Sequence, residues 1–453
     1  MAKKISPCVA LLVCLFLVFS CATKSEAYRD IDAAVGKNNF EEGIEAIKRG
    51  QENTRPIYPE KNAVSLFLDL GLLEHYAGKY SDSSGNLQEA ERLIEEAFTR
   101  SVTANLASYI ANDNTKEYPG EDFEDIYINV FNALNYYNRG NIEGALVEIR
   151  KLTLSSGKLD MLERKYENAE RNAGKEMDDT LNGYGVSKND ALPQGKPVNF
   201  SDSALARYLG ALFYLGDGNT DSARIEFENL RAAFAANPRV YSHSLPKSIE
   251  DIQTVPAGKA RLNVISFTGL SPIKEEGLFH QFFPFFNNAT LRKPVFKLPI
   301  FTKRQSVIDR IEIIIGTEKF NLELLENMGT VVEETYNARF TRLFLKTYIR
   351  TMLKYAAIDI TATEAVRQGV HPLLAEASAL ATKQAFDATE SADIRMSRYF
   401  PDKAHVGGIN LDPGNYSVAV HYYSRGSIVA KEEYMDVNVR ANRLNLIEAV
   451  CLK

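Results

Sequence analysis

The chain of 453 residues carries 53 Lys and Arg against 59 Asp and Glu, which gives a formal net charge of −6 at pH 7. This balance argues against a general nucleic-acid-binding protein, because such proteins need a cationic surface. With 45% hydrophobic and 25% charged residues, the composition excludes a disordered chain and predicts two or three folded domains.

Residues 1–20 have the organisation of a secretory leader. Lys3 and Lys4 precede an apolar run from Cys8 to Phe19, CVALLVCLFLVF, which is too short to cross a bilayer comfortably. The end of this run, LVFSC, resembles the lipobox of bacterial lipoproteins. That resemblance implies removal of residues 1–20 and a diacylglyceryl-modified, N-acylated Cys21, which would anchor the protein in a membrane. Plain secretion and an uncleaved anchor are the alternatives.

Removal of the leader changes both the charge and the cysteine count. It takes away two lysines and no acid, so 51 basic residues face 59 acidic residues and the net charge becomes −8. Cys8 and Cys14 leave with the leader, and an acylated Cys21 leaves Cys451 without a disulfide partner. Cys451 lies in the apolar stretch LIEAVCL, which predicts a buried strand residue. Ala22 after the cysteine implies sorting to the outer membrane, facing the periplasm.

Residues 21–236 contain four copies of one helical pattern. In the two clearest copies, Tyr136–Gly140–Ala145 and Tyr214–Gly218–Ala223, an aromatic residue lies four positions before a Gly and a small residue five positions after it. Looser copies centre on Gly78 and Asn38. This spacing resembles the tetratricopeptide repeat: the Gly opens the turn between two antiparallel helices, and the small residue lets the helices approach closely. Unrelated helical hairpins are the alternative for any single copy.

In such arrays the first helix of each pair lines a concave groove. The repeat register assigns nine residues to this groove, which mixes apolar and aromatic side chains suited to a peptide or protein segment. They are Leu68, Leu72, His75, Tyr127, Leu134, Tyr137, Tyr208, Leu212 and Leu215. Filling of the groove by helices inserted in the chain itself is the alternative.

The composition changes after residue 236. The stretches NPRVYSHSLPKS (237–248) and TVPAGK (254–259) predict a linker over residues 237–258. Residues 259–453 predict a mixed domain, because short alternating runs separated by Gly-containing turns favour an antiparallel sheet or small sandwich. The strand-like runs are 260–269, 307–316, 416–424, 427–439 and 443–452, and a helical insert spans about 320–395.

Two features of this second half are candidate surfaces. At 100° per residue, five cations of the insert share one helix side and predict a basic stripe, which would meet phosphates or an acidic partner or would simply be solvated. They are Arg339, Arg342, Lys346, Arg350 and Lys354. The aromatic run FHQFFPFF, 279–286, favours the seam between two domains over a membrane or partner contact.

Several stretches together resemble a family of largely uncharacterised bacterial lipoproteins with N-terminal tetratricopeptide-like helices. They are the lipobox cysteine, YPGEDFEDIYINVFNALNYYNRGNIEGALVEIRKL (118–152), VISFTGLSPIKEE (264–276), RLFLKTYIRTMLKYAA (342–357) and ADIRMSRYFPDKAHVGGINLDPGNY (392–416). The resemblance implies a periplasmic or outer-membrane lipoprotein, sometimes associated with activators of penicillin-binding proteins. It supplies no catalytic residues.

No motif indicates catalysis, a metal or a cofactor. The six His residues are scattered, and H-E-x-x-H, C-x-x-C, G-x-S-x-G and G-x-x-x-x-G-K-[ST] are all missing from the sequence. The acidic run 120–127 favours the N-terminus of a helix over a cation site, because acids stabilise that end of a helix. We therefore expect no enzyme, no metal and no cofactor.

The expected fold is α+β, with a tetratricopeptide-like helical array followed by a sheet domain with a helical insert. The expected function is a lipid-anchored scaffold or regulator of the cell envelope, with a membrane and a protein as partners. A nutrient-binding lipoprotein of the starch-utilisation type is the first alternative, although those proteins usually stack sugars on Trp and this chain has none. An envelope hydrolase is the second. The oligomeric state stays open.

Overall fold

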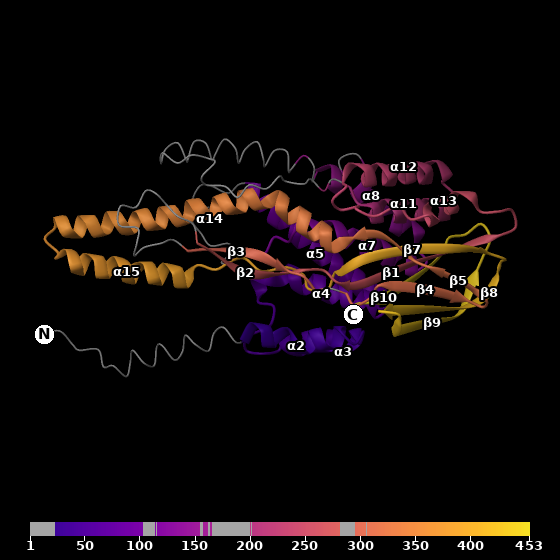
Figure 1. Cartoon of the computed structure of the whole chain (residues 1–453), viewed down its shortest axis with the longest axis horizontal. Coiled ribbons are helices and arrows are strands. Elements are labelled where there is room, and N and C mark those ends of the chain that lie inside the picture. The colour runs from indigo at the N-terminus through magenta and orange to yellow at the C-terminus, as the bar shows by residue number, and fades with distance from the viewer. Residues whose placement is uncertain are drawn as a thin grey trace.

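The computed structural model describes residues 23–102, 116–154, 157–161, 202–280, 295–304 and 306–453, together with Asn114, Arg164 and Phe200. The predicted leader, Cys21 and most of the aromatic run 279–286 lie outside these residues. The chain combines helices and strands, so the α+β class is confirmed (Figure 1).

Four helical hairpins form the first half of the described chain. They are α2 (Thr23–Val35) with α3 (Phe40–Gln51), α4 (Ala63–Tyr76) with α5 (Tyr80–Val102), α7 (Asp122–Asn138) with α8 (Ile142–Thr153), and α11 (Ala204–Gly216) with α12 (Thr220–Ala236). A short 3₁₀ turn, Glu60–Asn62, precedes α4. Neighbouring hairpins pack in chain order through α3 and α4, α5 and α7, and α8 and α11. The four predicted hairpins are thereby confirmed, whereas membership of a tetratricopeptide-like array stays a prediction.

The turn of each hairpin has the geometry that the sequence pattern requires. Asn38, Gly78, Gly140 and Gly218 have φ angles of +56°, +74°, +76° and +80°, in the left-handed region that Gly adopts without strain. Five residues further on, the small side chains of Ser83, Ala145 and Ala223 are buried, as is Gly43. Residues within a few positions of each turn therefore determine its conformation.

Two four-stranded sheets form the second half. The first has the order β10 (Asn445–Cys451), β1 (Ala260–Leu270), β7 (Pro401–Leu411) and β6 (Glu323–Asn327). The second has the order β5 (Glu318–Asn321), β4 (Arg310–Ile315), β8 (Gly414–Ser424) and β9 (Ser427–Val439). A separate ribbon pairs β2 (Ile273–His280) with β3 (Val295–Thr302).

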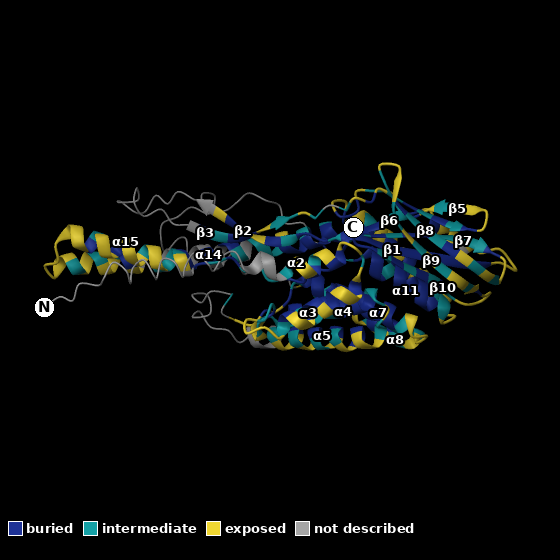
Figure 2. Ribbon diagram, turned by 90° about the horizontal axis from the view of Figure 1, so that it is seen from below, coloured by how far each residue is buried: buried dark blue, intermediate teal, exposed yellow. Residues whose placement is uncertain are grey.

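The first sheet is a middle layer, with the helices on one face and the second sheet on the other. Along β1, Ile265 and Phe267 belong to the core shared with the helices, whereas Leu262 and Val264 belong to the core between the sheets. Strand β1 is consequently buried along nearly its whole length (Figure 2). It pairs with β7 in the antiparallel sense but with β10 in the parallel sense, which differs from the antiparallel sheet that we expected. The long connection between β1 and β10 makes this parallel return possible.

Much of 237–252 is packed against the body rather than forming an exposed linker, whereas 254–258 are exposed as a linker would be. Val240 and Ile249 are 1% and 0% exposed, and the segment includes α13 (Ser248–Asp251) and a 3₁₀ turn, Ile252–Thr254. The helical half and the first sheet share one hydrophobic core, so the two halves form one body. Among the described residues, no helix has the length and apolarity that crossing a membrane requires.

A helical arm leaves this body between β6 and β7. It consists of α14 (Met328–Arg367) and α15 (Pro372–Thr389), so the insert begins later than predicted because residues 318–327 form β5 and β6. The 40 residues of α14 make a rod about 60 Å long at 1.5 Å per residue. Its first turns lie on the body, and its far part projects beyond the sheets together with α15 (Figure 1).

Candidate functional site

The nine residues assigned to the concave groove are covered to different extents, and three of them contact the chain's own sheet. Seven of them are buried, and Tyr137 and Leu215 are half-buried. His75 contacts Glu448 of β10 at 2.5 Å, and the hydroxyl of Tyr127 donates to Glu326 of β6 at 2.8 Å. The backbone N–H of Leu446 donates to the hydroxyl of Tyr137 at 3.0 Å. These residues are therefore not open to a partner, and the sheet fills this face rather than the inserted helices.

The predicted basic stripe is turned toward acids of the same protein. Arg339 lies 3.0 Å from Glu121, and Lys354 lies 2.6 Å from Glu390. Arg350 is 3% exposed and also pairs with Glu390. Arg342 and Lys346 belong to the helix, but their side chains lie outside the described residues. Arg350 therefore does not lie on the surface as the stripe requires, whereas the side chains of Arg339 and Lys354 are 37% and 21% exposed. Helix periodicity shows which residues share a side and not what covers that side.

The connection from α15 to β7, residues 391–400, passes between the helices and the sheet; we call it the crossing segment. Its Ser397 hydroxyl donates to Asp69 at 2.6 Å, and its Arg398 backbone N–H donates to the same carboxylate at 2.8 Å. The Ser397 N–H donates to Glu124 at 2.5 Å. Asp69 lies on α4 and Glu124 on α7, so two helical hairpins hold this one segment.

The crossing segment is also held at the first hairpin. Arg398 pairs with Asp32 of α2 at 2.8 Å, and its guanidinium lies 4.4 Å from the ring centre of Tyr28. The hydroxyl of Tyr399 donates to the same Asp32 at 3.0 Å. Three of the four hairpins therefore contact one segment that follows them by 273 to 367 residues in the sequence.

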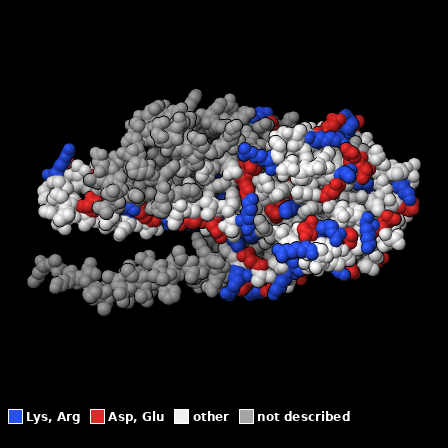
Figure 3. All heavy atoms as spheres, viewed as in Figure 1, with Lys and Arg blue, Asp and Glu red and all other residues white. Residues whose placement is uncertain are grey.

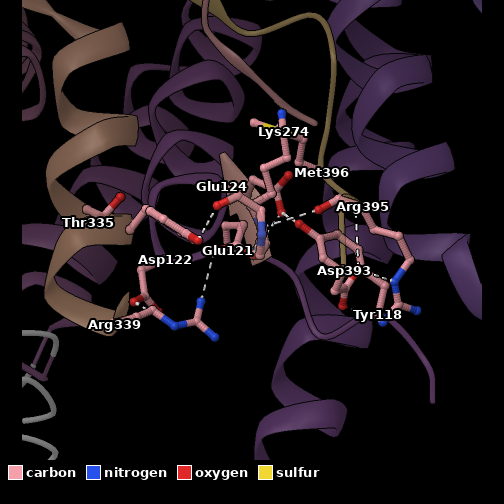
Figure 4. A network of polar contacts seen from close by, with 12 residues as sticks. Tyr118, Glu121, Asp122, Glu124, Lys274, Thr335, Arg339, Asp393, Arg395 and Met396 are labelled. Atoms are coloured by element: carbon pink, nitrogen blue, oxygen red, sulfur yellow. Dashed lines mark hydrogen bonds and ion pairs between the residues drawn. The ribbon is translucent and has the colours of Figure 1, made fainter. Parts of the chain in front are cut away.

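A polar network surrounds the start of α7, which begins at Asp122 as the acidic run predicted. Glu121 accepts from Lys274 of β2 and from Arg339 of α14, and its own N–H donates to Glu124 at 2.7 Å (Figure 4). The other part of the network joins Arg395 to Asp393 at 2.7 Å and sets the guanidinium of Arg395 5.2 Å from the ring centre of Tyr118. The arm, the β2–β3 ribbon and the crossing segment thus meet at one helix terminus.

Burial shifts the ionisation of the carboxylates that hold the crossing segment. It raises the pKa of Glu124 to about 7, and the neighbouring Glu121 charge acts in the same direction. Burial likewise raises the pKa of Asp69 to about 6, against the hydrogen bonds from Ser397, Tyr58 and Arg398. Both groups therefore titrate near neutral pH, in a part of the molecule that joins its two halves.

A further buried carboxylate, Glu326 of β6, was missed by sequence reasoning because nothing distinguishes it among 59 acids. It is 0% exposed and accepts from the hydroxyls of Tyr127 at 2.8 Å and Tyr241 at 2.7 Å. Ser203 Oγ at 3.0 Å and the Leu205 N–H at 3.2 Å are further donors to it. Burial raises the pKa of Glu326, and these hydrogen bonds oppose the rise only in part.

A third contact joins His75 to β10. Its Nδ1 lies 2.8 Å from Asn135 Oδ1, while its Nε2 faces Glu448. Burial alone would lower the pKa of His75, but the Glu448 charge and the two hydrogen bonds raise it overall. Cys451 of the same strand is buried as predicted, and its Sγ accepts from Asn38 Nδ2 at 3.4 Å.

The chemistry of these contacts is that of a structural junction. Each oxygen of Glu124 and of Asp69 already accepts a hydrogen bond from the protein. Within the described part of the chain, no group of three or more His, Cys, Asp or Glu side chains is arranged to hold a metal ion. The network therefore ties the helices, the sheets and the arm into one unit.

Comparison of the sequence with protein-family models gives no match, and comparison with curated proteins gives none. The resemblance to a family of bacterial lipoproteins accordingly stays a prediction.

Proposed function

We propose that this protein is a lipid-anchored scaffold or regulator of cell-envelope assembly, with the arm as the surface that it offers to a protein partner. The proposal that the arm binds the partner rests on the covered groove, because Tyr127 and His75, which were expected to bind a partner, contact β6 and β10 instead. A partner must therefore bind elsewhere on the body or on the arm.

Exposed apolar side chains on the far part of α14 favour the arm as the surface for a protein partner. Ile360 is 70% exposed there, and Val366 is 41% exposed at the end of the helix. Exposed apolar side chains on a projecting helix are typical of helix-mediated recognition. Arg339 and Glu121 fix the base of the arm to the body, and Arg350 and Glu390 join α14 to the end of α15 within the arm. These ion pairs favour a stiff presenting element over a loose one.

The first part of the proposal is the anchor. The apolar run up to Phe19 and the following Ser20–Cys21 support acylation of Cys21, and Ala22 supports placement in the outer membrane. Cys21→Ser should move the protein from the sedimented membrane fraction to the soluble fraction of fractionated cells. Unchanged sedimentation of the variant would overturn the anchor and leave the arm untouched.

Photo-crosslinking in cells tests the arm. A photoreactive residue at Thr363, on the far part of α14, should capture one defined protein, whereas the same residue at the equally solvent-exposed Thr220 of α12 should not. Equal capture from both positions would place the partner surface elsewhere. No captured protein, together with saturable oligosaccharide binding by the pure protein, would favour the nutrient-binding alternative.

A further inference from the structure

Helix α15 exposes an uncharged surface. Its solvent-exposed positions, which we call the α15 outer face, hold no Lys, Arg, Asp or Glu; they are Pro372, Leu373, Leu374, Ala377, Ser378, Leu380, Ala381, Thr382, Gln384, Ala385 and Ala388. Leu373 is 74% exposed and Leu374 is 65% exposed. A helix that packs on a protein in water usually exposes charged side chains, so the exposed leucines and the absence of charge set this face apart.

The charged residues of α15 lie toward α14. Lys383 pairs with Asp387 at 2.6 Å, and the hydroxyl of Tyr355 on α14 donates to Asp387 at 3.0 Å. The ammonium group of Lys383 lies 5.8 Å from the ring centre of Tyr355. The third charged residue, Glu376, is only half-buried. Lys383 and Asp387 are therefore used inside the hairpin, and the exposed side of α15 holds only uncharged residues.

Helix α12 provides the internal comparison, because it has 17 residues against 18 in α15 and is also rich in Ala. Its exposed positions include Asp221, Arg224, Glu228 and Arg231. In Figure 3 the far end of the arm has broad uncharged areas beside a Lys or Arg at its tip and a few charged side chains along its lower edge, whereas Lys, Arg, Asp and Glu are spread over the body. An uncharged outer face is thus a property of α15 and not of the surface in general.

The position of α15 suggests what covers this face. In Figure 1, α15 lies on the same side of α14 as α2, and the N-terminal end of α2 faces the side from which the arm projects. Figure 2, seen from below, shows α2 on the near side of the molecule, which agrees with this placement. Helix α2 begins at Thr23, two residues after Cys21, and two residues span at most about 7 Å. An acylated Cys21 would therefore hold this side of the molecule against the bilayer.

We propose that the α15 outer face rests on the surface of the lipid bilayer that carries the anchor. This inference rests on the proposed anchoring at Cys21. Leu373, Leu374 and Leu380 would enter the boundary between headgroups and acyl chains, and the absence of charge on this face makes the contact independent of anionic lipid. The contact needs little affinity of its own, because the anchor already keeps the helix beside the membrane.

A second copy of the chain fits this face less well. A helix of 18 residues is about 27 Å long, and a strip about 10 Å wide on it covers on the order of 300 Å². Stable dimers need roughly 800 Å² from each partner. The α15 outer face alone is too small for that role, whereas a bilayer sets no minimum area once the protein is tethered.

The test replaces the anchor by an artificial tether. The chain from Ala22 onward, which keeps every described residue, is given an N-terminal histidine tag and bound to nickel-chelating lipid in phosphatidylethanolamine–phosphatidylglycerol vesicles. An environment-sensitive dye on Ala381→Cys should become at least twofold brighter on tethering and should be quenched by brominated lipid. The same dye on Ala232→Cys, an exposed position of α12, should not change.

Two further variants control the result. Leu373→Glu combined with Leu374→Glu should abolish the dye response, whereas Ile225→Glu on α12, where the side chain is 48% exposed, should keep it. The proposal is overturned if the dye on Ala381→Cys is unaffected by brominated lipid. It is also overturned if the brightness of the dye rises with the density of protein on vesicles of fixed lipid composition. That dependence would indicate contact with a second copy of the chain. Since the tether is artificial, neither result depends on acylation of Cys21, which the fractionation of Cys21→Ser tests separately.

Discussion

The junction around the crossing segment and the far end of the arm use the same kinds of side chain in opposite ways. At the junction, carboxylates such as Asp69 and Glu326 are wholly buried, and each accepts several hydrogen bonds from other elements. At the arm, leucines lie in solvent while Lys383 and Asp387 are turned inward. A buried charge is expensive unless it is satisfied, and an exposed apolar face is unusual unless something covers it. The buried carboxylates of the junction are therefore satisfied within one chain, whereas the leucines of the arm are left in solvent.

The largest expected effect comes from breaking the junction at Glu326. Glu326→Ala would leave two buried tyrosine hydroxyls, a serine hydroxyl and a backbone N–H without their acceptor. We expect the free energy of unfolding to fall by about 3–5 kcal/mol in urea denaturation. The matched variant is Glu228→Ala, at an exposed carboxylate that pairs with Arg224 on α12, and it should cost less than about 1 kcal/mol. Equal losses of stability in both variants would show that the buried carboxylate of the junction contributes no more than an exposed one.

The next effect is a pH dependence of the junction. The pKa of Glu124 is about 7 in the folded state against an ordinary value of 4.5, so the folded state takes up this proton more readily than the unfolded state. Its contribution to stability is then fully present below about pH 4.5 and is lost as the pH rises through 7. Asp69, with its raised pKa, acts in the same direction. Between pH 8 and pH 5 we expect Glu124 to contribute a gain of about 2–3 kcal/mol, which His405, whose pKa burial lowers to about 3, opposes in the protein as a whole.

Glu124→Gln is the control for this pH dependence. The amide does not titrate, so the change in stability between pH 8 and pH 5, measured by urea denaturation, should be about 2–3 kcal/mol less favourable in the variant than in the wild type. Glu228→Gln on α12 should leave the profile unchanged. A variant that gains as much stability as the wild type over this range would contradict the assigned direction.

A smaller effect on stability is expected at two glycines of the helical hairpins, which differ in backbone φ but not in the space around them. Gly140 has a φ of +76°, and no neighbouring atom lies within 4 Å of the place that an added methyl group would take, so Gly140→Ala costs only backbone strain, about 1–2 kcal/mol. Gly85 lies within α5, has equal free space and no positive φ, so Gly85→Ala should stabilise the protein by up to about 1 kcal/mol. Thermal unfolding measures both, and destabilisation by both would show that crowding rather than φ decides.

The smallest effect is expected at the arm. Leu373→Ser combined with Leu374→Ser should change the free energy of unfolding in solution by no more than about 0.5 kcal/mol, because both side chains are already in water. A loss of several kcal/mol in urea denaturation would mean that these leucines contribute to the fold and would end the contrast with the junction.

The features that sequence predicts well are local ones. The turns at Asn38, Gly78, Gly140 and Gly218 depend on residues within a few positions, and all four lie in the expected place. The start of α7 at Asp122 follows from the same kind of short-range chemistry.

The candidate site could not be predicted in this way. Tyr127 and Glu326 are 199 residues apart, and Arg339 and Glu121 are 218 apart. The periodicity of α14 placed Arg339, Arg350 and Lys354 on one side, but no pattern showed that Glu121 and Glu390 would pair with them. The prediction of an open groove failed for the same reason, because a repeat register describes the helices and not the sheet that packs on them.

The parallel pairing of β10 with β1 has a consequence for biogenesis. Asn38 near the start of the described chain accepts a hydrogen bond from the backbone N–H of Leu452, 414 residues later. His75 likewise obtains its Glu448 partner only from β10. Since a ribosome makes these partners long after the hairpins, the flank of the helices that packs on the sheet stays uncovered until β10 has been synthesised.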